Sequence, residues 1–342
     1  MKILIISPTQ SGIGGIAQHV EGLTKFLKKN GHDVDIISSE NTFTIPIKGL
    51  KNPSFMISSF LKAKFKKNQD IVHAHNIPAA LAMKNTTGKK ILSLHGIFSQ
   101  QIDELHGKVT GIISAKYEKN ALEWADAITV ISKEAYDYYS KLGYKVFQVP
   151  NAIDISSIGS RQTRQYPKQI IFAGRLSREK GIDSLIRIAK KLENDIHLII
   201  LGTGPEEQKI NDLIKTQKNI HYLGYKKKEE TLSLIQGSDI LIQPSLKEGI
   251  SSTLLEAMAC KTAIIASSVG GNSELVENEV NGILAEPQDD DSFVEQITSL
   301  LNNEQLRKSF VENALKTVKK YDWNHVGNLY LSIYESIPSQ SK

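Results

Sequence analysis

Short runs of apolar residues recur along the chain, and stretches with helical periodicity separate them. The first run, Lys2–Ser7, reads KILIIS, and an amphipathic stretch from Ile16 to Asn30 follows it and ends before Gly31. Apolar runs without polar alternation predict parallel strands that helices cover on both faces. Further strands are predicted in the first half at Val34–Ser38, Ile71–His75, Ile91–His95, Ala127–Ile131 and Lys145–Val149.

The same alternation begins again after a polar segment, Asp154–Pro167, whose serines and glycine are typical of a linker. The second half predicts strands at Gln169–Ala173, His197–Gly202, Ile220–Leu223, Ile240–Gln243, Ala263–Ser267 and Gly282–Ala285. Helices are expected near Ile182–Leu192, Glu206–Thr216, Lys228–Gly237, Thr253–Ala259 and Asn272–Val276.

Two such halves predict an α/β protein with two doubly wound, Rossmann-like domains facing a cleft. Ligands of such domains bind at the carboxyl ends of the strands. We expect domains at 1–155 and 169–320, joined by a linker at 156–168. The last stretch, 321–342, contains a predicted helix with an apolar face, and we expect it to cross back onto the first domain.

The composition agrees with two ordinary globular domains. The chain has 342 residues, of which 40% are hydrophobic and 23% are charged. Its single cysteine, Cys260, excludes an internal disulfide framework, fits a reducing compartment and lies in an apolar run typical of a buried thiol. The N-terminus enters a strand at once, and the apolar runs are too short to span a bilayer. We therefore expect no signal peptide and a cytoplasmic protein.

The formal charge of +5 is unevenly distributed along the chain. Residues 1–150 carry 19 Lys and Arg against 12 Asp and Glu, and residues 151–342 carry 23 against 25. The basic excess of the first half is modest for a protein that binds nucleic acid, and no recognition motif accompanies it. We expect no nucleic-acid partner.

The segment Glu248–Met258, EGISSTLLEAM, carries two carboxylates around an expected helix start. Ser251, Ser252 and Thr253 suit an N-cap or a first turn, and a helix N-terminus favours a phosphate. Glu248 and Glu256 could then hold hydroxyl groups on either side of the phosphate, which suits a sugar nucleotide. Two solvated surface glutamates are the alternative.

The loop after the first strand contains Gly12, Gly14 and Ala17, which formally match the G-x-G-x-x-A dinucleotide fingerprint. Four residues separate the strand from Gly12, whereas the fingerprint places its first glycine directly after the strand. A longer glycine loop can instead lie near a second substrate or a leaving phosphate, and a flexible turn is the remaining reading.

The segment Phe172–Ile182, FAGRLSREKGI, places Arg175 and Lys180 in the loop after the first strand of the second half. Two cations there can neutralise a diphosphate and stabilise its charge as it leaves. An ordinary basic surface loop is the alternative.

Three histidines, His73, His75 and His95, end two predicted strands of the first half. His73 and His75 share one strand face, but the sequence offers no evident third ligand, so no metal site is predicted. His95 is expected to face the cleft, although a lone histidine is more often a core residue. Asp289–Asp291 has the D-x-D spacing of some metal sites, but we interpret it as a solvated acidic turn.

The order of these motifs resembles the GT-B glycosyltransferases, specifically the retaining family 4 group. The resemblance covers nearly the whole chain. It rests on Gly14-Gly15, SLHG ending in His95-Gly96, PNAID at Pro150–Asp154, GRLSREKGID at Gly174–Asp183, GTGP at Gly202–Pro205, EGISSTLLEAMAC at Glu248–Cys260 and VGGNSELV at Val269–Val276.

The resemblance implies a role for each matching residue. Arg175 and Lys180 bind the donor diphosphate, Glu256 holds the ribose hydroxyls and Glu248 contacts the hydroxyls of the donor sugar. His95 lies in the active site near the transferred sugar. The remaining donor contacts are backbone groups and the glycine loop, at Gly14, Gly15, Ser252, Thr253 and Leu254.

The chain departs from the family pattern at three places. Ile250-Ser251 stand where Phe and Gly or Pro are common, and we expect this pair close to the sugar. Lys261-Thr262 replaces Gly-Pro, and Ala152 replaces the glycine of the PNG turn. Because no charged group assigned to the chemistry is missing, an active enzyme is expected.

We expect a retaining, metal-independent transfer of sugar from a UDP- or GDP-sugar to a glycan or lipid-linked acceptor, with no cofactor. No paired carboxylates that flank the bond are identifiable, so departure of the diphosphate with same-face attack by the acceptor fits better than a double displacement. An NAD-dependent oxidoreductase and a non-catalytic nucleotide-sugar binder remain as alternatives.

The segment Lys48–Lys67 mixes six lysines with aromatic and aliphatic residues. A basic amphipathic surface of this kind can rest on anionic lipid. Family 4 enzymes often use membrane acceptors, so the resemblance implies peripheral attachment to the inner face of the membrane. A packed helix with solvated lysines is the alternative.

Overall fold

A computed structural model describes residues 1–10, 14–47, 49–97 and 108–338, with only the backbone of 108–114. Gly12 of the glycine loop and Lys48 of the basic segment lie outside the described residues. The chain forms two compact units, one of Met1–Ala152 with Trp323–Lys342, the other of Ile153–Asp322. The predicted linker, 156–168, falls within the second unit, where Thr163 N–H donates to the Ser233 carbonyl at 2.8 Å.

The N-terminal unit contains a parallel sheet of six strands in the order β2-β1-β3-β4-β5-β6 among the described residues. Residues 3–6 of the first strand are fully buried, as expected for a strand covered on both faces. The strands are β1 (Lys2–Ser7), β2 (Asp33–Ser38), β3 (Ile71–His75), β4 (Lys89–Leu94), β5 (Ala127–Val130) and β6 (Val146–Gln148).

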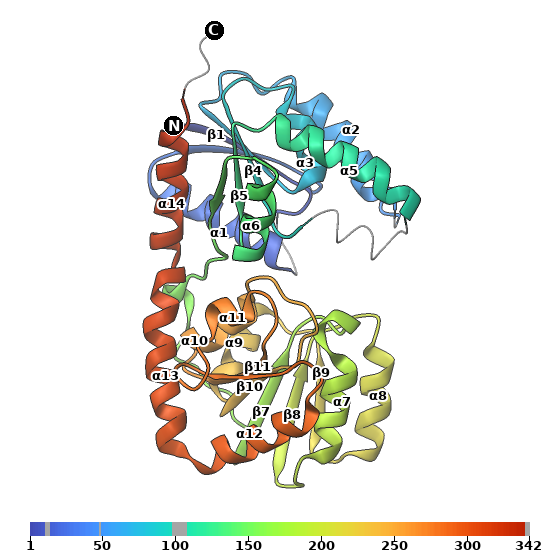
Figure 1. The fold of residues 1–342 in the computed structure, drawn as a ribbon, viewed down its shortest axis with the longest axis vertical. Helices are drawn as coiled ribbons and strands as arrows, with labels where there is room; N and C mark the ends of the chain where they lie inside the picture. Colours follow the sequence, from blue (N-terminus) through green and yellow to red (C-terminus); the bar gives the residue numbers. More distant parts are fainter. Residues whose placement is uncertain (11–13, 48, 98–107, 339–342) are drawn as a thin grey trace. The chain divides into compact units, whose positions relative to one another are not determined.

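Helices cover both faces of this sheet (Figure 1). One face packs against α2 (Lys51–Ala63), α3 (Ile77–Met83), α5 (Lys108–Glu123) and α6 (Lys133–Lys141). The other face packs against α1 (Gly15–Lys29) and α14 (Trp323–Ser336). The C-terminal helix therefore contributes Trp323, Tyr330 and Tyr334 to the core of the N-terminal unit.

The C-terminal unit contains a second parallel sheet of six strands, in the order β12-β11-β10-β7-β8-β9. Its strands are β7 (Lys168–Ala173), β8 (Ile196–Leu201), β9 (Ile220–Gly224), β10 (Ile240–Gln243), β11 (Ala263–Ser267) and β12 (Ile283–Ala285). One face packs against α7 (Ile182–Lys191), α8 (Glu207–Thr216) and α12 (Asp290–Asn302). The other packs against α9 (Lys228–Gln236), α10 (Ser252–Ala259) and α11 (Asn272–Leu275), while α13 (Glu304–Val318) contributes to both cores.

The strand order reverses once in each sheet, between β1 and β3 in the first and between β7 and β10 in the second. Loops that leave two strands in opposite directions open a crevice at such a switch point, and ligands of doubly wound sheets bind there. The predicted α/β fold with two doubly wound halves is confirmed.

The predicted strands differ from the observed ones by at most two residues at an end. The acidic segment Asp289–Asp291 is not a solvated turn: Asp289 caps α12 by accepting from Ser292 N–H at 3.0 Å, and Asp290 is buried beside Arg187. A helix N-terminus favours acidic residues, which explains why three of them cluster here.

Candidate active site

The loops after β7 and β10 meet at the switch point of the C-terminal sheet through an ion pair. Lys180 Nζ lies 2.5 Å from Glu248 Oε2. The same carboxylate oxygen accepts from Gln243 Nε2 at 2.7 Å and from Ser245 Oγ at 3.2 Å. Three donors thus fix one oxygen of Glu248, and the Lys180 side chain is partly exposed beside it.

Glycines let the backbones of these loops approach so closely. Gly181, which precedes α7, has φ +70°, and a Cβ on it would lie 1.8 Å from the carbonyl oxygen of Pro244. Gly270 has φ +44°, and a Cβ there would lie 2.1 Å from the Glu248 carbonyl oxygen. Only glycine fits such a contact at a positive φ. Lys180 and Glu248 are therefore positioned by backbone packing as well as by their own contact.

Ser251 caps α10 and also supports Glu248. Its Oγ accepts from Leu254 N–H at 3.4 Å and donates to Gln243 Oε1 at 3.0 Å, so it orients the amide that binds Glu248. Ser251 and Ile250 are both buried, and the expectation that this pair lies close to the sugar stays a prediction. The Leu254 amide is already occupied, so the first-turn amides of Ser252 and Thr253 are the ones without an intrahelical acceptor.

Glu256 lies in the second turn of α10 and is buried, with 7% of its surface exposed. Lys228 Nζ, at the start of α9, lies 3.6 Å from Glu256 Oε1. Burial raises the pKa of the Glu256 carboxyl, while the charge of Lys228 opposes that shift. A buried carboxylate with one distant cationic partner retains acceptor capacity for hydroxyl groups.

Arg175 is exposed in the loop that follows β7. The GTGP loop after β8 supports this segment, because Gly174 N–H donates to the Leu201 carbonyl at 3.1 Å and Leu176 N–H donates to the Thr203 carbonyl at 2.9 Å. A Cβ on Gly202 would lie 1.8 Å from the Gly174 carbonyl oxygen. The glycines of the GTGP motif thus serve close backbone packing under Arg175.

In the N-terminal unit, His95 directly follows β4 and is partly exposed. The backbone N–H of His95 donates to Asn76 Oδ1 at 3.0 Å. Its ring Nε2 lies 3.2 Å from Nδ1 of His75. Burial lowers the pKa of His95 to about 4, so the ring is neutral at physiological pH. His73 and His75 are fully buried, and their rings stack with centroids 4.3 Å apart.

The glycine loop leads into α1, which begins at Gly15. Gly14 has φ +128°, and a Cβ on either glycine would meet nothing within 4 Å among the described atoms. The helix start therefore has room for a side chain among the described atoms, next to the N-terminal amides that favour an anion.

The predicted residues fall into two groups, one in each unit. Arg175, Lys180, Glu248, Ser252, Thr253, Leu254 and Glu256 belong to the C-terminal unit, and His95, Gly14 and Gly15 belong to the N-terminal unit. Three further residues contact the two glutamates and were not predicted from the sequence: Gln243, Ser245 and Lys228. The signal for Gln243 was its place at the carboxyl end of a buried strand, where a polar side chain is unusual.

Over the residues that the structure describes, no group of three or more His, Cys, Asp or Glu side chains is arranged to hold a metal ion. Within the same residues, helices are either too short or too polar to cross a membrane.

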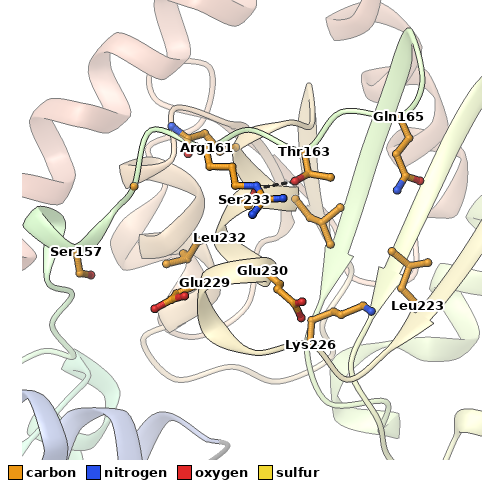
Figure 2. A pocket seen from close by; sticks show the side chains of 13 residues that line it. Ser157, Arg161, Thr163, Gln165, Leu223, Lys226, Glu229, Glu230, Leu232 and Ser233 are labelled. Atoms are coloured by element: carbon orange, nitrogen blue, oxygen red, sulfur yellow. Dashed lines mark hydrogen bonds between the residues drawn. The ribbon is translucent and has the colours of Figure 1, made fainter.

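A cavity of about 650 Å³ lies in the C-terminal unit between residues 157–165 and α9 (Figure 2). Its lining includes Leu223 of β9, Lys226 after that strand, and the acidic pair Glu229 and Glu230. Figure 2 shows the Thr163 and Ser233 side chains joined across one end of it, with their hydroxyl oxygens 2.7 Å apart. The cavity does not include Lys180, Glu248 or Glu256, so it is separate from the charged loops at the switch point.

Two doubly wound sheets with polar groups at their carboxyl ends define a two-domain α/β protein, in which ligands bind at those strand ends. Residues 13–157 match the family described as Glycosyltransferase Family 4, and residues 157–317 match the family described as Glycosyl transferases group 1. The chain belongs to the GT-B glycosyltransferases of group 1, family 4. This membership decides for a glycosyltransferase over the oxidoreductase and the non-catalytic binder.

Curated relatives span the whole chain at low identity. An uncharacterised glycosyltransferase of Methanocaldococcus jannaschii is 28% identical and covers 98% of this chain and 99% of its own length. A phosphatidyl-myo-inositol mannosyltransferase of Mycolicibacterium smegmatis is 24% identical and covers 98% of this chain and 94% of its own length.

Solved structures share the fold. A sucrose-phosphate synthase from Thermosynechococcus elongatus superposes with a TM-score of 0.82 at 19% identity, over 98% of each chain. Anabaena HepE in complex with UDP-glucose superposes with a TM-score of 0.75 at 17% identity, over 98% of this chain and 100% of its own.

Proposed function

We propose that this glycosyltransferase takes its sugar from a nucleoside diphosphate sugar and transfers it with retention at the anomeric carbon. The observation that carries the proposal is the Lys180–Glu248 ion pair at the switch point, next to the start of α10. A cation for phosphate, a carboxylate for hydroxyl groups and a helix N-terminus for an anion meet there. Together they match the two chemical halves of a nucleotide sugar.

The donor engages these groups by exchanging one set of contacts for another. The diphosphate takes Lys180 from Glu248, and Arg175 and the amides of Ser252 and Thr253 add further positive partners. Glu248, released from its lysine, accepts hydrogen bonds from sugar hydroxyls. Glu256 accepts from the ribose hydroxyls, for which its buried position leaves oxygen atoms available.

In the transfer step, the bond between the anomeric carbon and the diphosphate oxygen breaks as the acceptor hydroxyl bonds to the same face of that carbon. The acceptor proton passes to the departing diphosphate. Arg175 and Lys180 stabilise the negative charge that develops on the leaving group. His95, held neutral, contributes a hydrogen bond to the transferred sugar.

The names of similar proteins support this choice of substrates. Structures of HepE contain UDP and UDP-glucose. Curated relatives include the phosphatidyl-myo-inositol mannosyltransferase and a Campylobacter jejuni enzyme that acts on a diphospho-undecaprenol acceptor. We therefore propose a UDP- or GDP-sugar donor and a glycan or lipid-linked acceptor.

A thermal-shift panel of UDP-, GDP- and ADP-sugars tests the donor, followed by an assay of donor hydrolysis and transfer with the sugar nucleotide that stabilises most. Stabilisation by one sugar nucleotide and its consumption with an α-linked product from an α-linked donor support the proposal. An inverted product overturns the stereochemical part, and stabilisation by none of the panel overturns the donor class.

We also propose that the segment around α2 contacts anionic lipid. Large apolar side chains stand exposed there in unusual number, with Phe65 85% and Phe43 74% exposed. The others are Ile47, Leu50, Ile57 and Leu61. Among the lysines, Lys62 and Lys66 contact Asn41 and Asp35, so the exposed cations are Lys51, Lys64 and Lys67. Apolar side chains beside lysines fit an interfacial surface.

Co-sedimentation with liposomes tests this surface. We expect binding to vesicles with anionic lipid, weaker binding to zwitterionic vesicles, and loss of binding in the double variant Phe43→Ser, Phe65→Ser. Leu142→Ser is the matched control, because Leu142 is also exposed in the N-terminal unit but follows α6. Binding that is independent of anionic lipid, or equally weakened by the control, contradicts the surface.

A further inference from the structure

His75 contacts the ring of His95 from inside the core of the N-terminal unit. His75 ends β3, is fully buried, and its Nδ1 lies 3.2 Å from Nε2 of His95. Among the described residues, no polar atom lies within hydrogen-bonding distance of the other ring nitrogen of His75, Nε2. One nitrogen of this buried ring is thus committed to His95, and the other has no hydrogen-bond partner among the described residues.

This asymmetry determines where the protons sit. A neutral imidazole carries one N–H and one lone pair, and the hydrogen bond needs one of each. If His95 donated Nε2–H to Nδ1 of His75, the proton of His75 would have to be on its Nε2, where a buried N–H would lack an acceptor. If His75 instead donates Nδ1–H to Nε2 of His95, the buried Nε2 of His75 carries only a lone pair. Buried donors without acceptors are rarer in proteins than under-used acceptors, so the second arrangement is favoured.

The surroundings keep these rings neutral. Burial lowers the pKa of His75 well below its usual value, and burial together with the neighbouring His95 lowers the pKa of His73 to about 3. His19 of α1 is also buried, with its ring centroid 5.1 Å from that of His95 and a lowered pKa.

The orientation of the His75 ring is fixed by its neighbour. His73 Nδ1 lies 2.7 Å from the Tyr334 hydroxyl of α14, and His73 Nε2 lies 2.6 Å from Ser93 Oγ of β4. Both nitrogens of His73 therefore have partners, and its ring stacks on that of His75 at 29°. A ring stacked on a fixed ring has little freedom to turn its Nδ1 away from His95.

We propose that His75 is a positioning residue for His95, donating Nδ1–H to Nε2 of His95 and so holding the His95 proton on Nδ1. His95 then offers an N–H donor, and not a basic nitrogen, at its partly exposed side. A donor can bind a hydroxyl or carbonyl oxygen of the transferred sugar or its acceptor. This role rests on the proposed function of His95 in the active site.

Long-range ¹⁵N–¹H spectra of the full chain labelled at histidine test the proton arrangement without any substrate. His95→Asn identifies the His95 signals by their loss. We expect a protonated Nδ1 and a bare Nε2 on His95. A protonated Nε2, or an average of the two tautomers, overturns the proposal.

Kinetics of three variants test the consequence. In His75→Leu we expect a mixture of His95 tautomers and a fall in kcat of about tenfold, with the donor KM within about twofold of wild type. His75→Asn places an amide N–H where Nδ1 stands, and we expect it to restore both the tautomer and most of kcat. Ser59→Ala is the matched control, since it removes a buried hydroxyl of the N-terminal unit that bonds within α2 to the Met56 carbonyl and not to the histidines, and we expect it to keep the wild-type kcat.

A folded His75→Leu protein with unchanged His95 tautomer and kcat overturns the proposal, and so does an Asn variant as impaired as the Leu variant. The proposed function and the proposed proton arrangement can be contradicted independently. A wild-type protein that transfers no sugar contradicts the proposed function, while the spectra still decide the proton arrangement.

Discussion

The two units differ in the side chains that they place at the carboxyl ends of their strands, which are charged in one unit and neutral in the other. In the C-terminal unit, the loops at the carboxyl ends of the strands bring together charged groups, with Lys180 against Glu248 and Lys228 against Glu256. In the N-terminal unit, the corresponding ends carry neutral imidazoles around His95 and His75. Yet the N-terminal half has the basic excess in the sequence.

This difference shows that net charge and site charge are separate properties. The described lysines of the first half lie at exposed or half-buried positions, around α2 among other places, whereas His95 and His75 are neutral. The nearly balanced second half places Arg175 and Lys180 in the loop after β7, where the proposed diphosphate would bind. One unit is thus suited to hold an anionic donor, and the other to present hydrogen bonds to an uncharged sugar.

The largest expected effect comes from removing the cations of the C-terminal unit. Lys180→Ala and Arg175→Ala should each lower the rate of transfer at least about tenfold, which corresponds to about 1.4 kcal/mol or more of lost transition-state stabilisation. Steady-state kinetics of donor consumption measures this. Lys191→Ala is the control, because its partner Asp291 is exposed on α12 away from the switch point. Wild-type rates in both site variants would remove the cationic role.

Substitution of Glu256 should affect stability and donor binding in opposite directions. Because burial raises the pKa of this carboxyl, the folded state holds its proton more tightly than the unfolded chain, and stability falls as the pH rises through the folded pKa. Glu256→Gln removes the charge, so we expect a higher Tm than wild type at pH 7.5 and a smaller gain at pH 4.5. Donor affinity should fall about tenfold, as for a lost hydrogen bond to a charged acceptor.

Two measurements test this prediction: the Tm of both proteins across this pH range, and their affinity for the donor by calorimetry. A Gln variant that binds donor as wild type does would mean that Glu256 is only a structural residue.

Acidification should lower the stability of the N-terminal unit, which is the opposite of the pH effect expected for Glu256. The pKa of buried His73 is lowered to about 3 and that of His75 well below its usual value, so these rings stay neutral when folded but gain protons when unfolded. Stability is therefore lost as the pH falls below about 6.5, by about 1.4 kcal/mol for each such histidine at pH 5.5.

Hydrogen exchange of β3 amides at pH 7.0 and 5.5, corrected for intrinsic rates, measures this loss, with β10 of the C-terminal unit as the reference. His73→Gln should reduce the pH dependence of β3. Equal protection of β3 at both pH values would show that the histidines are not buried as neutral rings.

The smallest effect is expected at the glycine loop. A Cβ on Gly15 at the start of α1 would meet none of the described atoms within 4 Å, so Gly15→Ala should leave stability unchanged or raise it by less than about 1 kcal/mol. If the donor or acceptor approaches this helix end, the added methyl group should still lower transfer several-fold. Thermal unfolding and kinetics of the same protein measure both effects, and unchanged transfer would place the substrates elsewhere.

The sequence predicted the sheets well because their strands are apolar on both faces. β3 and β10 were predicted at their observed ends, since buried runs such as ILIQ have no other place than a covered sheet. The helices α12 and α13 were not predicted, and Asp289–Asp291 was misinterpreted, because acidic residues suit both a helix N-terminus and a solvated turn.

The sequence offers candidate site residues by type but does not show which of them contact one another. The motif named Lys180 and Glu248 for separate ligand groups, and only the fold shows that the two side chains bind each other. Gln243 and His75 could not be assigned either, because their roles depend on neighbours across a strand order that local patterns do not reveal.

The central claim is that the C-terminal unit binds the nucleotide and that the N-terminal unit acts in the transfer. Calorimetric titration of UDP and GDP into wild type, Lys180→Ala and His95→Ala, with a transfer assay of the same proteins, tests it most directly. We predict that one of the nucleotides binds wild type, that Lys180→Ala weakens its binding at least about tenfold, and that His95→Ala leaves its binding within about twofold while abolishing most of the transfer. Nucleotide binding that depends on His95 and not on Lys180 would contradict the account.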